Sequence, residues 1–103
     1  MQFDREFDIP LDRADARILV RTGGRPVKEY AVLLQLEVGG QWMTIRLIDN
    51  HLDEHHMHRY DGPSKRQPGE RFAVGKIDEV LPKAIEHLAG AANSIIDSWN
   101  TKP

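Results

Sequence analysis

The chain has 103 residues, no cysteine and a formal net charge of −2 at pH 7. This length suits a single domain, residues 1–103, and the lack of cysteine excludes disulfides and thiolate zinc sites, so that a metal would need His, Asp or Glu ligands. The slightly acidic balance argues against a broadly basic nucleic-acid binder, while the charged first eight residues and the absence of an apolar run of about 20 residues predict a cytoplasmic protein that does not enter the membrane.

The first quarter of the chain carries weak strand signals. Apolar and polar residues alternate from Phe3 to Ile9, and a short strand is predicted over Arg17–Arg21. The segment 22–26, with the sequence TGGRP, has the composition of a turn. We therefore expect these segments to supply the other strands of the sheet.

A β-hairpin is predicted around Gly39-Gly40, because paired glycines accept the positive φ angles of a two-residue turn. Counting outward from this turn pairs Val38 with Gln41, Leu36 with Met43, Leu34 with Ile45 and Val32 with Leu47. One face of the hairpin then carries the apolar residues assigned to the core: Tyr30, Val32, Leu34, Leu36, Met43, Ile45 and Leu47. The other face is mixed and includes Trp42, Thr44, Arg46 and Ile48.

The last quarter of the chain predicts an amphipathic helix, since apolar residues recur at three- and four-residue steps from Ile77 to Trp99. Asp78 is a candidate N-cap, but Pro82 disfavours helical geometry at Leu81, so we expect the regular helix to begin only there. The predicted fold is α+β, an antiparallel sheet of four or five strands covered on one face by this helix.

Four of the five histidines fall within eight residues, between Asp49-Asn50 and Arg59-Tyr60; they are His51, His55, His56 and His58. Imidazole titrates nearest neutral pH and is the commonest metal ligand, so this cluster is the candidate site. If residues 55–60 form a strand, alternation puts His56, His58 and Tyr60 on one face, and His55, Met57 and Arg59 on the other.

Several interpretations of this cluster are open. His56 and His58, with a third ligand from His51, Asp49, Asp53 or Glu54, would suit a divalent transition metal. Two imidazoles could instead act as acid and base on a ribose 2′-hydroxyl and its phosphate, with Arg46 or Arg59 stabilising the developing charge. The segment could also be a polar loop that is merely rich in histidine. Finally, the domain could be a non-catalytic interaction module that binds a protein partner through its exposed sheet face, including Trp42.

The run Leu36–Tyr60 resembles the small TumE-like proteins, toxins of bacterial toxin–antitoxin systems, and a related group of uncharacterised short proteins of bacteria and archaea. In such proteins an Arg-Tyr-Asp-Asn type motif closes a strand, a histidine cluster follows within a short loop, and a helix ends the chain. The same order of parts extends over about two thirds of this sequence. The resemblance implies a toxin-like activity directed at RNA and an antitoxin protein as partner.

Carried over by residue, the resemblance marks as catalytic Asp49, Asn50, His55, His56 and His58, with Asp49 orienting one imidazole. The family arginine stands two positions before the aspartate, where this chain has Leu47, and Arg46 lies one position earlier on the other strand face. Arg59, Tyr60 and Arg46 are our candidates for contacting nucleic acid.

Overall fold

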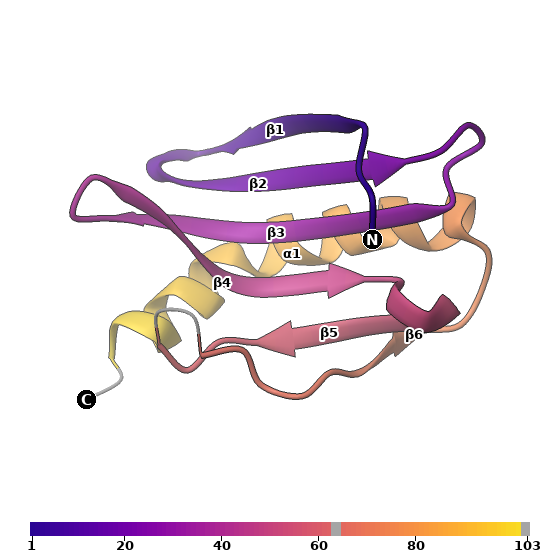
Figure 1. The fold of residues 1–103 in the computed structure, drawn as a ribbon. Helices are drawn as coiled ribbons and strands as arrows, with labels where there is room; N and C mark the ends of the chain where they lie inside the picture. The colour runs from indigo at the N-terminus through magenta and orange to yellow at the C-terminus, as the bar shows by residue number, and fades with distance from the viewer. Residues whose placement is uncertain (63–64, 102–103) are drawn as a thin grey trace.

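The computed structural model describes residues 1–62 and 65–101. Six antiparallel strands follow one another in chain order across one sheet, and the helix α1 (Ile77–Asn100) lies behind it (Figure 1). A 3-10 turn, η1 (His51–Asp53), precedes the fifth strand. The strands are β1 (Arg5–Leu11), β2 (Arg13–Gly23), β3 (Glu29–Val38), β4 (Gln41–Asp49), β5 (His55–Arg59) and β6 (Glu70–Ala73). The α+β prediction is confirmed, with six strands in place of four or five.

The strand that the sequence did not signal is β6. It has only four residues, and two of the four are charged, so it lacks the apolar alternation that identifies a longer strand. Its pairing with β5 is irregular as well, because Phe72 is an extra residue between Arg71, opposite His56, and Ala73, opposite His55. As a result β5, which carries the histidines, is an interior strand with neighbours on both sides.

The predicted hairpin register is confirmed close to the turn and wrong further along. Val38 pairs with Gln41 and Leu36 with Met43, around glycines with φ of 60° and 80°. A β-bulge then inserts one extra residue into β4, so that Leu34 lies opposite Arg46 and Val32 opposite Ile48. The alternation of apolar and polar residues does not reveal a β-bulge. The pairs counted outward from the turn are therefore wrong beyond the bulge.

The bulge exchanges the faces of the second half of β4. Ile48 joins the core beneath α1, whereas Leu47 packs on the opposite side of the sheet. Arg46 is half-buried on the helix side, where burial lowers its pKa and its Nε has no hydrogen-bond partner within the described residues. Asp49, two residues after Leu47, therefore shares the face of Leu47.

The helix covers only one face of the sheet, and the core lies between the two. Its fully buried members include Ile18, Val20, Tyr30, Val32, Leu34, Ile45, Ile48, Leu88 and Ile96. We call the opposite sheet face, with Leu19, Ala31, Leu33 and Leu47 at its centre, the open face. Phe3 and Tyr60 pack against this smaller apolar cluster.

The helix begins at Ile77, earlier than predicted, with Lys76 rather than Asp78 as its N-cap. Pro82 removes a single backbone donor, and the buried Val80 and Ala84 anchor the turns on either side of it against the sheet. Packing of the helix against the sheet thus outweighs the local effect of Pro82, from which we predicted a later start. Within the described ranges, no helix combines the length and apolarity needed to cross a bilayer.

Candidate functional site

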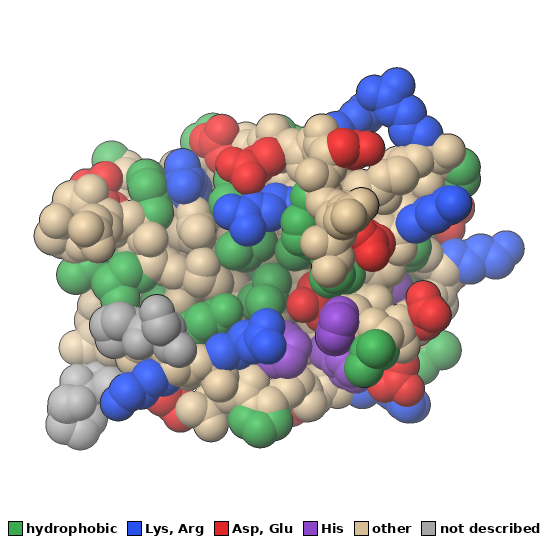
Figure 2. All heavy atoms as spheres, in the orientation of Figure 1, with side chains coloured by type: hydrophobic (Ala, Val, Ile, Leu, Met, Phe, Trp, Pro, Cys, Tyr) green, Lys and Arg blue, Asp and Glu red, His purple; other side chains and the backbone are tan. Residues whose placement is uncertain are grey.

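Strand β5 divides the histidines between the two faces of the sheet, which confirms the predicted alternation. His58 lies opposite Leu47 and His56 opposite Asp49, so both lie on the open face. Their ring centroids are 6.3 Å apart and the rings are nearly perpendicular, at 80°. Figure 2 views this face and shows histidine side chains gathered together, with Lys or Arg side chains close by. The open face is therefore where two imidazoles can act on one ligand.

His55 is on the helix side and is held at both ring nitrogens. Its Nε2 lies 2.7 Å from the carbonyl oxygen of Gly75, which can only accept, so Nε2 carries a proton. In the neutral ring Nδ1 then accepts from the hydroxyl of Tyr30, also at 2.7 Å. Because His55 is only 6% exposed and has no free nitrogen, its geometry supports a structural role and not the predicted catalytic one.

The buried phenol of Tyr30 makes stability depend on alkaline pH. Burial raises the pKa of Tyr30 above its ordinary value of 10.0, and the charge of Asp49 adds to the rise. Above about pH 10 the unfolded chain loses this proton while the folded chain keeps it, so stability should fall there by up to about 1.4 kcal/mol per pH unit. At pH 7, Tyr30→Phe should lower the free energy of unfolding by about 1 kcal/mol, because the hydrogen bond to His55 is removed. Above about pH 10, the stability of this variant should decline less steeply than that of wild type.

Urea unfolding at neutral and at alkaline pH measures both effects. Since the other titrating groups are the same in the two proteins, the difference between their pH slopes isolates Tyr30. A variant whose stability declines above pH 10 as steeply as that of wild type would show that Tyr30 does not contribute to the alkaline loss.

Asn50 also has a structural role. Its Oδ1 accepts from the backbone N–H of Tyr30 and its Nδ2 donates to the carbonyl of Lys28, each at 2.9 Å. The side chain is 6% exposed and links the end of β4 to the start of β3. The catalytic role predicted for Asn50 therefore has no support in its surroundings.

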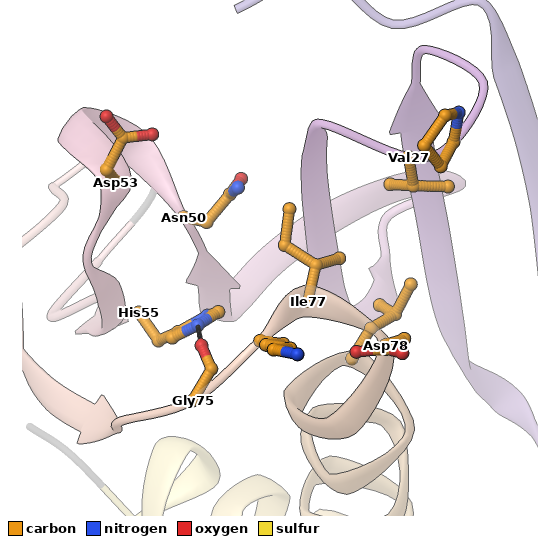
Figure 3. A pocket seen from close by; sticks show the side chains of 10 residues that line it. Val27, Asn50, Asp53, His55, Gly75, Ile77 and Asp78 are labelled. Atoms are coloured by element: carbon orange, nitrogen blue, oxygen red, sulfur yellow. Dashed lines mark hydrogen bonds between the residues drawn. The ribbon is translucent and has the colours of Figure 1, made fainter.

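Asn50 and His55 line a pocket of about 560 Å³ at the end of the sheet. Figure 3 shows them on one side of this pocket, with Val27 and Ile77 on the other. A ligand pocket usually orients its ligand with a few free polar groups among apolar walls. Asn50 and His55 already bond within the protein, and the pair His56 and His58 does not line this pocket, so we do not assign the reactive site to it.

His56 and His58 differ from His55 because only one ring nitrogen of each is hydrogen-bonded within the described part of the protein. Nε2 of His56 donates to Oε2 of Glu54 at 2.9 Å, and Nδ1 of His58 donates to the carbonyl oxygen of Gln67 at 3.0 Å. The neutral rings then hold their lone pairs on Nδ1 of His56 and Nε2 of His58. Both side chains are half-buried, so they are oriented and still reachable. This is the arrangement that proton transfer requires.

Sequence patterns did not identify most of the residues that position these two rings. Glu54 precedes His56 by two residues, so alternation along an extended segment could have placed both on one face. Gln67 and Gly69 come from the segment before β6, for which no local pattern existed. A Cβ at Gly69 would lie 2.7 Å from Cε1 of His58, so glycine alone lets the chain approach this ring.

Asp49 lies on the open face but does not hold an imidazole. Its Oδ1 accepts from the backbone N–H of His51 at 3.4 Å, so the orienting role predicted for it belongs to Glu54 and Gln67. Burial raises the pKa of Tyr60, with Arg66 opposing and Asp49 adding to that rise. Tyr60 therefore stays protonated near neutral pH and is a hydrogen-bond donor beside the histidines.

Two arginines expected to contact nucleic acid lie on the helix side of the sheet, away from His56 and His58. Arg46 and Arg59 are neighbours across β4 and β5 on the helix side, and Nε of Arg59 is 3.3 Å from Oε1 of Glu70. The sequence missed Arg71, which lies opposite His56 and whose side chain forms no hydrogen bond or ion pair with any residue that the structure describes. Of the three predicted contact residues, only Tyr60 shares the face of the histidine pair.

Trp42 also belongs to the open face, but at its far end. The guanidinium of Arg17 lies 4.3 Å from the centre of the indole ring and also donates from Nε to Gln35. The indole is 36% exposed. Trp42 therefore covers the neighbouring strands, where Arg17 contacts its ring and Gln35.

The structure does not assemble the three-histidine metal site. Outside positions 63–64 and 102–103, no three His, Asp or Glu side chains are grouped so that they could hold a metal ion. His51 is exposed in η1, where Leu52 and Asp53 both have φ near 60° and turn the chain away from β4. Metal binding by His51, His56 and His58 remains a prediction without geometric support.

No protein-family model, curated protein or solved structure matches this chain. The resemblance to TumE-like toxins thus remains a prediction from the sequence pattern. The functional argument consequently rests on the geometry of the open face.

Proposed function

We propose that this protein is a toxin of the toxin–antitoxin type that cleaves RNA, with His56 and His58 as its acid and base. The observation that carries the proposal is the pair of half-buried imidazoles on the open face, each fixed at one ring nitrogen and free at the other. Cleavage requires a base that takes the proton of the ribose 2′-hydroxyl and an acid that protonates the leaving 5′-oxygen. Two imidazoles in opposite protonation states meet both needs.

In this reaction the 2′-oxygen bonds to phosphorus, the bond from phosphorus to the 5′-oxygen breaks, and a 2′,3′-cyclic phosphate forms. Negative charge grows on the phosphate oxygens, so donors and cations nearby lower the barrier. The protonated phenol of Tyr60 supplies such a donor on the same face. The proposal includes a cytoplasmic location and an antitoxin protein that blocks the open face.

Single-turnover cleavage of labelled RNA by the purified wild-type protein tests this function. We expect fragments that end in a 2′,3′-cyclic phosphate, formed at the same rate with and without a chelator. Expression in bacteria without the neighbouring reading frame should stop growth. Folded protein that leaves RNA intact both in chelator and with added divalent metal would refute the ribonuclease proposal, and unimpaired growth would refute the toxin part.

A second candidate function is a non-catalytic module that binds a protein partner. Two large apolar side chains close to the histidine strand favour it, because Leu52 is 79% and Val74 is 81% exposed. Exposed apolar side chains of this kind commonly mark contact surfaces when they form a patch. The cleavage assay separates the two functions, since a binding module has no turnover.

A further inference from the structure

We propose that a small pocket beside His56 binds a guanine base of the RNA, an inference that rests on the proposed function and names its substrate preference. The pocket has a volume of about 230 Å³ and lies where η1 and β5 meet the end of β6. Asp53, Glu54 and Arg71 supply its charged walls, and Ala73 and Val74 supply apolar ones.

The pocket adjoins the histidine pair through two of its own residues. Glu54 accepts the hydrogen bond from Nε2 of His56, and Arg71 lies directly opposite His56 in the sheet. His56 does not itself line the pocket, but Glu54 and Arg71 do, so a base held there would bring its ribose and phosphate toward His56. The pocket is thus placed to select the nucleotide at the cleaved bond.

The charges in this pocket are available to a ligand. Arg71 and Asp53 have opposite charges and line the same small space, yet neither side chain forms an ion pair or hydrogen bond with any described residue. One wall therefore offers free donors, and another offers a free carboxylate acceptor. Because two carboxylates line the pocket, a phosphate group would be repelled there. A neutral ligand with both donors and acceptors fits these walls.

Guanine has the matching pattern. Its O6 and N7 accept, and the Arg fork binds this pair with two hydrogen bonds. Its N1–H and exocyclic amino group donate together, which suits a carboxylate. Adenine instead presents an amino donor where guanine has O6, so Arg71 would meet a donor. Since pockets for drug-sized ligands measure roughly 300–1,000 Å³, this smaller pocket suits a single base.

Titration with 3′-mononucleotides, followed by the backbone amide signals in NMR spectra, tests the pocket without any cleavage. Guanosine 3′-monophosphate should shift the amides of Glu54, Ala73 and Val74 and should bind about ten-fold more tightly than the adenosine, cytidine and uridine nucleotides. Such a ratio is about 1.4 kcal/mol, within the range of one bidentate contact.

Two variants that each remove one charge from the pocket should abolish this preference. Arg71→Gln and Asp53→Asn should each weaken the binding of guanosine 3′-monophosphate about ten-fold. Asparagine tolerates the left-handed φ of 60° at position 53, so this variant should keep the local backbone conformation. Arg5→Gln and Asp12→Asn, at the far edge of the sheet, are the matched controls and should bind like wild type.

The outcomes distinguish the pocket from the proposed function. Equal affinity for all four nucleotides, or shifts confined to other residues, would overturn the pocket, and tighter binding of the cytidine nucleotide would overturn its assignment to guanine. Guanosine 3′-monophosphate binding by protein that cleaves no RNA would support the pocket and refute the ribonuclease proposal. RNA cleavage without preference for guanosine would support the ribonuclease and refute the pocket.

Discussion

His56→Ala and His58→Ala should each lower the single-turnover rate of RNA cleavage by a factor on the order of 10² to 10⁴, the usual contribution of a positioned acid or base. The wild-type rate should follow a bell-shaped curve near neutral pH, because one ring must be neutral and the other protonated. In each variant one limb of that curve should disappear. Rates measured in chelator across pH 5 to 9 check both expectations.

His87→Ala is the matched control for these variants. His87 is an exposed imidazole on α1, and its ring centroid lies 5.4 Å from that of Phe72. Its removal should leave the cleavage rate unchanged. The double variant of His56 and His58 should lower the cleavage rate little more than either single variant, since the effects of residues that act as a unit are not additive. Wild-type rates in both single variants would show that these imidazoles are not the acid and base.

Leu34→Asp should leave the domain unfolded at room temperature. Leu34 is 0% exposed in the centre of β3, beneath α1, and the described core around it is apolar. A carboxylate there loses its hydration without gaining a partner, which costs several kcal/mol. That cost is comparable with the roughly 5–15 kcal/mol by which small domains are stable. Circular dichroism and thermal melts of the purified variant measure the loss.

Thr44→Asp introduces the same charge on the opposite face and should have a far milder effect. Thr44 is partly exposed, and its hydroxyl accepts a hydrogen bond from Gln35 at 3.2 Å, a bond that a carboxylate can also accept. Melting temperatures that are similar for the two variants would mean that the sheet faces are assigned wrongly.

The sequence by itself determined the elements whose causes are local. Gly39-Gly40 fixed the hairpin turn, because few other residues adopt positive φ at both positions. The apolar periodicity from Ile77 to Trp99 determined the helix and the face that it buries. Strand alternation determined that His56 and His58 share one face while His55 lies on the other. Each of these features depends on residues within a few positions of one another.

Only the tertiary structure decided the environment of each histidine. Tyr30 and Gly75 engage both nitrogens of His55, and they are 25 and 20 residues away in the chain. A single extra residue in β4 sent Arg46 to the helix side and brought Asp49 to the open face. Pairing of β6 with β5 placed Arg71 opposite His56. Hydrogen bonds and strand pairs between distant segments decide which imidazole nitrogens stay free, and periodicity within one segment carries no information about them.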